Sequence, residues 1–130
     1  AGAVFTAGEI ARTGPVVGAE QPTRGCRSAL KLLEDRDREH ACVVDTSQRF
    51  VGVVSAESLR SALKDHDGSL GLQHALLPPV QPVAATHPVS ELFGQVAQAT
   101  HPLPVVDARG RYVGSISKTT LLKFLDRNAE

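Results

Sequence analysis

The chain has 130 residues, of which 42% are hydrophobic, and this is enough to bury a substantial core. Its 14 basic and 14 acidic residues give a formal net charge of zero, so we expect no broad basic surface for nucleic acid. No apolar run reaches the length of a membrane-spanning helix and no signal peptide opens the chain, so we predict neither membrane insertion nor secretion.

The first half of the chain is predicted to alternate short strands and helices. Apolar, β-branched runs on either side of the polar turn Asp45–Gln48 are typical of a hairpin. Leu59 and Leu63 lie four residues apart, which places both on one face of a helix that Ser55 caps. The predicted elements are a short helix at Ala7–Arg12, a strand at Pro15–Val17, a helix at Arg27–Asp37 with Leu30 and Leu33 inward, a hairpin over Ala41–Asp45 and Phe50–Val54, and the helix after Ser55.

The second half repeats this order. Apolar residues with i, i+3, i+4, i+7, i+8 spacing predict an amphipathic helix, and they are Val89, Leu92, Phe93, Val96 and Ala97. The other predicted elements are a short helix at Leu70–Leu77, a strand at Pro82–Ala84, a hairpin over Leu103–Asp107 and Tyr112–Ile116, and a helix after Ser117 with Leu121 and Leu125 on one face.

An internal repeat explains why both halves have the same order of predicted elements. Val43–Leu63 aligns without a gap on Val105–Leu125 at an offset of 62 residues, and nine of the 21 positions are identical. Repeated units of this kind bury their apolar faces against each other. We therefore predict a mixed α/β (α+β) fold, in which residues 1–130 form one module of two units related by an approximate twofold axis. The repeat boundaries are 1–66 and 67–130, and two equivalent clefts are expected between the copies.

The copies differ in one loop. Pro15 matches Pro82 at an offset of 67 residues, which predicts five extra residues in the first copy between Gly18 and Arg27. Arg24 and Arg27 lie there at the start of a helix, where anions are favoured, although a plain surface insertion explains the same pattern.

Chemistry-bearing motifs are otherwise sparse. Cys26 and Cys42 lie outside any CxxC pair, which is typical of a reduced compartment, and the five histidines show no metal-ligand spacing. We predict no metal site and no catalytic residue. The absence of methionine, even at position 1, predicts a piece of a longer protein or a processed chain.

The segments Phe50–Ser55 and Tyr112–Ser117, each a strand ending in Gly-apolar-apolar-Ser or its close variant, resemble tandem cystathionine β-synthase (CBS) domain pairs. The helix Arg27–Glu39 and the stretches Leu70–Leu77, Pro88–Leu92 and Leu103–Asp107 are similar to glycine betaine/proline ABC transporter ATP-binding subunits. In that family a CBS pair follows the nucleotide-binding domain of an importer for compatible solutes. The chain has no G-x-x-x-x-G-K-[ST] loop, so the fragment itself is not expected to hydrolyse ATP.

The resemblance implies a regulatory, non-catalytic module at the inner face of the cell membrane. It implies a homodimer of CBS modules, with the ATPase domain and the membrane subunit as further partners and no nucleic acid. Three functions stay open: control by ionic strength, sensing of an adenine nucleotide or cyclic dinucleotide, and a purely structural role in dimerisation.

The resemblance also places ligand-cleft candidates. In nucleotide-binding CBS domains a hydroxyl at the helix start meets phosphate, and an aspartate three residues later binds ribose. Ser55 and Ser117 supply the hydroxyls, but Ser58 and Thr120 stand at the aspartate positions, which removes the ionised acceptor. The other cleft candidates are Val17, Arg24, Arg27, Val83 and Lys118.

Overall fold

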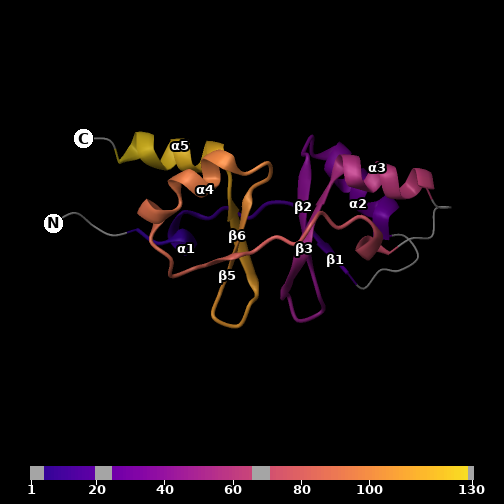
Figure 1. Cartoon of the computed structure of the whole chain (residues 1–130), viewed down its shortest axis with the longest axis horizontal. Coiled ribbons are helices and arrows are strands. Elements are labelled where there is room, and N and C mark those ends of the chain that lie inside the picture. Colours follow the sequence, from indigo (N-terminus) through magenta and orange to yellow (C-terminus); the bar gives the residue numbers. More distant parts are fainter. Residues whose placement is uncertain (1–4, 20–24, 66–70, 129–130) are drawn as a thin grey trace. The chain divides into compact units, whose positions relative to one another are not determined.

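The computed structural model describes residues 5–19, 25–65 and 71–128 (Figure 1). The chain divides into two compact units. Gly14–Val80 form one, which we call the first unit, and Ala1–Thr13 with Gln81–Glu130 form the other, which we call the second unit.

The first unit is a three-stranded sheet covered by two helices. Strand β1 (Val16–Gly18) lies parallel to β2 (His40–Val44), which pairs antiparallel with β3 (Phe50–Ser55). Helices α2 (Gly25–Asp35) and α3 (Ala56–Asp65) pack against each other, and the 3₁₀ turn η1 (Leu72–His74) closes the unit. The core consists of apolar residues from all these layers, among them Leu33, Val43, Val54, Leu59 and Leu72.

The second unit repeats this topology. Its sheet has the order β4 (Val83–Ala84), β5 (Leu103–Val106) and β6 (Tyr112–Ile116), again with one parallel and one antiparallel pairing. The 3₁₀ turn η2 (Val89–Glu91) leads into α4 (Phe93–Gln98), which contacts α5 (Lys118–Arg127). Helix α1 (Ala7–Ile10) completes the core.

The predicted element order and the mixed α/β (α+β) class are confirmed, with shifts in detail. Strand register aligns Val17 with Val83, an offset of 66 residues, because Val17 pairs with Val43 and Val83 with Val105. The proline match at 67 was therefore one residue out of register, and the insertion in the first copy is shorter than predicted.

Helix α2 ends two residues before the predicted limit. Asp37 adopts a left-handed backbone with φ of 52°, and Asp37 N–H and Arg38 N–H donate to the Glu34 and Leu33 carbonyls. This is a Schellman ending, which satisfies the last carbonyls of the helix and stops it at Asp35. The charged stretch that follows is consequently not helical.

Two predicted apolar faces are also narrower than expected. Phe93, with 36% exposure, and Leu125, with 41%, lie at the surface rather than in the core. The buried pairs on the last helix of each unit are instead spaced i, i+3, as Leu59 with Ala62 and Leu121 with Phe124. The four-residue leucine spacing therefore overestimated how much of α5 is covered, whereas on α3 Leu63 is half-buried and packs against the core as predicted.

Each unit is completed by a segment from the other side of a repeat boundary. Residues 5–12, which we call the N-terminal strap, pair with β6 in the second unit: Arg12 and Ser115 exchange backbone hydrogen bonds of 2.9 and 2.8 Å. Residues 71–77, the linker strap, make the equivalent contact with β3 in the first unit, where Leu77 N–H donates to Val53 O at 2.8 Å. The edge of each sheet is thereby covered by a strap.

The straps explain the glycine of the repeated motif. A Cβ on Gly114 would lie 2.9 Å from Ala11 Cβ and 3.2 Å from Arg12 O, and a Cβ on Gly52 would lie 2.9 Å from Leu76 Cδ2. Both glycines are buried beneath a strap. The glycine therefore permits close approach of the strap backbone at Gly114 and of the Leu76 side chain at Gly52.

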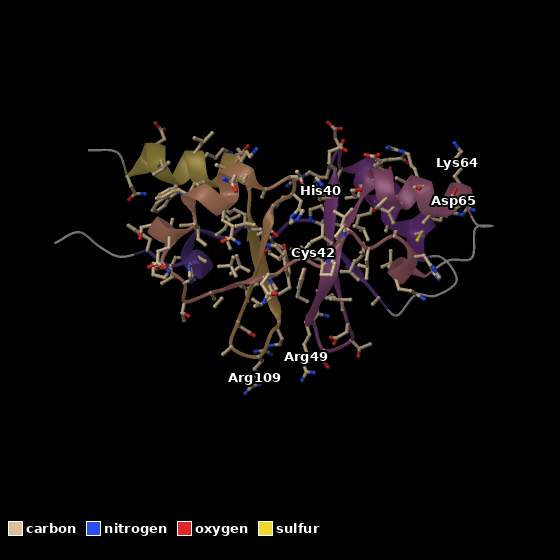
Figure 2. The ribbon with its side chains drawn as sticks, viewed as in Figure 1. His40, Cys42, Arg49, Lys64, Asp65 and Arg109 are labelled. Atoms are coloured by element: carbon tan, nitrogen blue, oxygen red, sulfur yellow. The ribbon has the colours of Figure 1, made fainter. Side chains whose placement is uncertain are left out.

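An aspartate organises each hairpin turn. Asp45 Oδ1 accepts hydrogen bonds from Ser47 N–H and Arg49 N–H, both at 2.9 Å. Asp107 Oδ1 accepts from Arg109 N–H at 2.9 Å and Arg111 N–H at 3.0 Å, and Arg111 Nε lies 2.9 Å from Asp107 Oδ2. Arg49 and Arg109 lie near the tips of their hairpins (Figure 2).

The two turns differ at one strained position. Gln48 has a φ of 67°, whereas the equivalent residue in the second hairpin is Gly110 with a φ of 79°. A left-handed backbone costs a residue with a side chain about 1–2 kcal/mol, and glycine avoids this cost.

We predict that Gln48→Gly raises the free energy of unfolding by about 1 kcal/mol, measured by urea denaturation. Gly110→Gln is the matched reversal and is expected to lower it. Destabilisation by Gln48→Gly would contradict this interpretation.

Acid is predicted to weaken the second hairpin through Asp107. Backbone hydrogen bonds from Arg111 and Arg109 and the charge of Arg111 lower the pKa of Asp107 below its ordinary value. The carboxylate therefore stabilises the fold above the unfolded pKa, and this contribution is lost as pH falls through the lower folded pKa. The stability difference between wild type and Asp107→Asn should be largest near pH 7 and should shrink on acidification to pH 3, in urea titrations. Asp126→Asn, on the exposed face of α5, is the control, and a difference that stays constant with pH would refute the role of Asp107.

Candidate functional site

The start of α3 in the first unit carries a closed pair of serines. Ser58 N–H donates to Ser55 Oγ at 2.8 Å, and Ser55 N–H donates to Ser58 Oγ at 2.9 Å. This is the reciprocal arrangement of a capping box, with serine in place of the usual glutamate. Ser58 Oγ also donates to Ser55 O at 3.1 Å. Both hydroxyls are therefore engaged with the backbone that they cap.

The start of α5 in the second unit is arranged differently. Ser117 Oγ accepts a hydrogen bond from Thr120 N–H at 3.1 Å and lies 3.0 Å from Thr120 Oγ1. A pocket of about 230 Å³ opens beside this cap, and its lining includes Thr100, His101, Ser117, Lys118 and Thr119. The pocket places a helix N-terminus, hydroxyls and an ammonium group together, a combination suited to a negatively charged group.

The remaining sequence-predicted candidates fall in several environments. Val17 lines a pocket of about 260 Å³ with Ser28, Ala29, Leu32 and others, whereas Arg27 is exposed on α2. Val83 is only 6% exposed and belongs to the core of the second unit. Arg24 lies outside the described residues. Within the second unit, Ser117 and Lys118 therefore share a pocket, and within the first unit only Ser55 and Ser58 are in contact by hydrogen bonding.

Sequence reasoning overlooked Thr100 and His101. His101 Nδ1 lies 2.9 Å from Pro102 O, and His101 is one of the residues that line the pocket beside α5. The register explains this placement, because Leu103 pairs with Ile116 and so the residues before β5 lie beside those after β6. An antiparallel hairpin brings the start of one strand to the end of the other. The hairpin predicted from the sequence was therefore sufficient to place His101 beside the start of α5.

Other kinds of site find no support among residues 5–19, 25–65 and 71–128. No group of three or more metal-ligating side chains occurs in these ranges, and none of their helices is both long and apolar enough to cross a membrane. Cys26 and Cys42 are buried thiols without a disulfide. Burial raises the pKa of the Cys26 thiol, whose Sγ donates to Gly71 O at 3.4 Å. A raised pKa disfavours the reactive thiolate.

Known proteins resemble this chain in sequence and in fold. The ATP-binding protein ProV of the glycine betaine/proline betaine transport system of Salmonella typhimurium is 47% identical over 125 residues. The match covers 95% of this chain, and the chain spans about 30% of the length of that relative. Solved structures of similar fold include Staphylococcus aureus OpuCA, with a TM-score of 0.78 and 16% identity over 92% of this chain and 97% of that one. They also include CBSX2 in complex with AMP, with a TM-score of 0.80 and 20% identity over 97% of this chain and 99% of that one.

The family is shown by the sequence itself. The CBS domain matches twice, over residues 7–65 and 74–127, and each match begins in one of the straps, at α1 and at the end of η1. The chain therefore belongs to the CBS domain family and carries two consecutive copies of the domain.

Proposed function

We propose that the chain is the regulatory CBS pair of the ATP-binding subunit of a glycine betaine or proline betaine importer. The 47% identity to ProV over 95% of the chain carries this proposal. In the longer protein the pair would lie at the inner face of the membrane, beside the ATPase domain and the membrane subunit. It would regulate rather than catalyse, since the chain has no phosphate-binding loop of the P-loop type.

Regulation is proposed to act through a homodimer of CBS pairs. The exposed side of helix α5 carries apolar and cationic side chains, which we call the α5 surface: Lys118, Leu122 and Leu125 on one flank, and Lys123 and Arg127 on the other. Leu122 is 66% exposed and Leu125 is 41% exposed, although both belong to an amphipathic helix. Exposed leucines at this spacing favour a helix-to-helix contact with a second copy.

Ionic strength is the proposed signal. Lys118, Lys123 and Arg127 form no ion pair with any described residue, whereas Arg111 is held by Asp107 and Arg60 by Glu34, with N–O distances of 2.9 and 3.4 Å. The unpaired cations are available to acidic groups of a partner. Such contacts weaken as the Debye length falls below about 10 Å above 0.1 M salt. A coupling of about 1–3 kcal/mol is sufficient to change a binding affinity about 5- to 150-fold.

The dimer contact is tested by Leu122→Asp. The added charge would face apolar side chains of the partner, so we expect the dissociation constant to rise at least about tenfold, a change of about 1.4 kcal/mol. Sedimentation equilibrium measures it. Val113→Asp is the matched control, because Val113 is 41% exposed but lies on β6. Unchanged dimerisation of Leu122→Asp, or an equal loss in both variants, would argue against the α5 surface as the contact.

The salt mechanism is tested in the full-length transporter. Neutralising the free cations by Lys118→Gln, Lys123→Gln and Arg127→Gln should flatten the dependence of ATP hydrolysis on salt concentration while ATP hydrolysis at the reference salt is kept. A triple variant with an unchanged salt profile rules out these cations as sensors. If deletion of residues 1–130 lowers assembly without altering the salt profile, a purely structural dimerisation role is supported instead.

The pocket beside α5 favours a second candidate, the sensing of an adenine nucleotide or cyclic dinucleotide. Ser117, Lys118 and His101 line it, while Thr120 stands where the resemblance expects the ribose-binding aspartate. Calorimetry with AMP, ATP and cyclic di-AMP at millimolar concentration provides the test. Heat that disappears in Lys118→Glu would support this function, and no heat with any of the three would exclude it.

A further inference from the structure

The N-terminal strap is anchored along its whole length to the second unit. Its backbone donates from Ala7 N–H to His87 O at 2.8 Å, from Gly8 N–H to Ala85 O at 2.9 Å and from Arg12 N–H to Ser115 O at 2.9 Å. It accepts from Val89 N–H at Phe5 O, at 2.9 Å. The strap is therefore held just after β4, at the turn before α4 and at β6.

Apolar contacts reinforce this anchorage and reach α5. Ala7 is fully buried and Ile10 is 7% exposed, and both belong to the core of the second unit. The rings of Phe5 and Phe124 meet edge to face with centroids 5.0 Å apart. Phe124 lies on the buried side of α5, while Leu122 and Leu125 of the same helix are exposed. The strap therefore contacts the helix that carries the α5 surface.

The strap also packs closely over Gly114, a position that favours glycine. Gly114, with φ of 154°, lies beneath Ala11 and Arg12, and a Cβ there would collide with Ala11 Cβ at 2.9 Å and crowd Arg12 O at 3.2 Å. Local contacts keep the strap in shape, because the Glu9 carboxylate accepts from Thr6 N–H at 2.8 Å and from Thr6 Oγ1 at 3.0 Å. The strap is thus an ordered segment with its own hydrogen bonds rather than a loose connection.

The order of the two units along the chain decides which of them the N-terminal strap joins. The N-terminal strap belongs to the second unit, and the chain enters the first unit only after Thr13. We propose that the N-terminal strap couples the preceding ATPase domain to the second unit. The connection from that domain then reaches the second unit, which residues 81–130 mainly form, before it reaches the first unit. This inference rests on the proposed function, because it needs a regulated domain ahead of the chain.

Two insertions in the full-length subunit test the proposal. A six-residue Gly/Ser insertion ahead of Phe5 should uncouple regulation, since a flexible coil transmits no directed displacement. The same insertion between Thr13 and Gly14 lies beyond the strap and should leave regulation in place. The readout is the ratio of ATP hydrolysis at high and low salt: we expect a ratio near 1 for the first insertion, and a ratio within twofold of wild type for the second.

The outcomes separate this proposal from the proposed function. If wild type and a subunit lacking residues 1–130 respond equally to salt, the proposed function fails and the strap proposal falls with it. If the response needs residues 1–130 but is lost in the Thr13–Gly14 insertion, or survives the insertion ahead of Phe5, only the strap proposal is overturned.

A matched pair of glycine variants gives an independent test. Gly114→Val should displace the N-terminal strap, whereas Gly52→Val, at the equivalent position of the first unit, meets only the end of the flexible Leu76 side chain and serves as the matched control. We expect Gly114→Val to reduce the salt ratio at least fivefold more than Gly52→Val. Hydrogen exchange at the Ala7, Gly8 and Arg12 amides must show that the strap has been released while the β5 amides stay protected, which distinguishes release from unfolding of the unit. A strap released in this way with an unchanged salt ratio overturns the proposal.

Discussion

The close approach of a strap to the last strand of each sheet is the contact on which the architecture depends. At Gly114 the absence of a side chain lets a distant backbone segment pair closely with the strand edge, and at Gly52 it leaves room for the Leu76 side chain of the linker strap. Each strap also carries buried residues into the core, Ala7 and Ile10 in the second unit and Leu72 and Ala75 in the first. A sheet of three short strands and two helices is small, so these residues contribute a substantial part of the burial that stabilises it.

The two units share a topology but differ in the chemistry at the start of their last helices. In the first unit Ser55 and Ser58 satisfy each other, and the result is a closed cap. In the second unit the cap at Ser117 adjoins a pocket with Lys118 and His101. The surfaces differ as well, because α3 carries Arg60, paired with Glu34, where α5 carries the exposed Leu122. The proposed partner contact and the proposed anion pocket consequently both lie in the second unit.

Local patterns in the sequence predicted the order of elements well, since hairpins, caps and amphipathic spacing depend on neighbouring residues. They did not predict the contacts and burial that depend on a segment distant in the sequence. The sequence has no local signal that Ala11 lies over Gly114 or that Leu76 lies over Gly52, so the repeated glycine was assigned to the motif without its physical reason. Leu125 and Phe93 match a helical stripe, but neighbouring elements do not reach them. His101 was missed because strand register, rather than composition, brings it to the pocket.

Hydrogen exchange on the isolated chain tests the strap contacts most directly. The Arg12 amide donates to Ser115 O and the Leu77 amide to Val53 O, so both should exchange about as slowly as amides in the central strands β2 and β5. Exchange of Arg12 and Leu77 at the rate of an unstructured peptide, with β2 and β5 still protected, would show that the straps are not part of the folded units and would contradict the account.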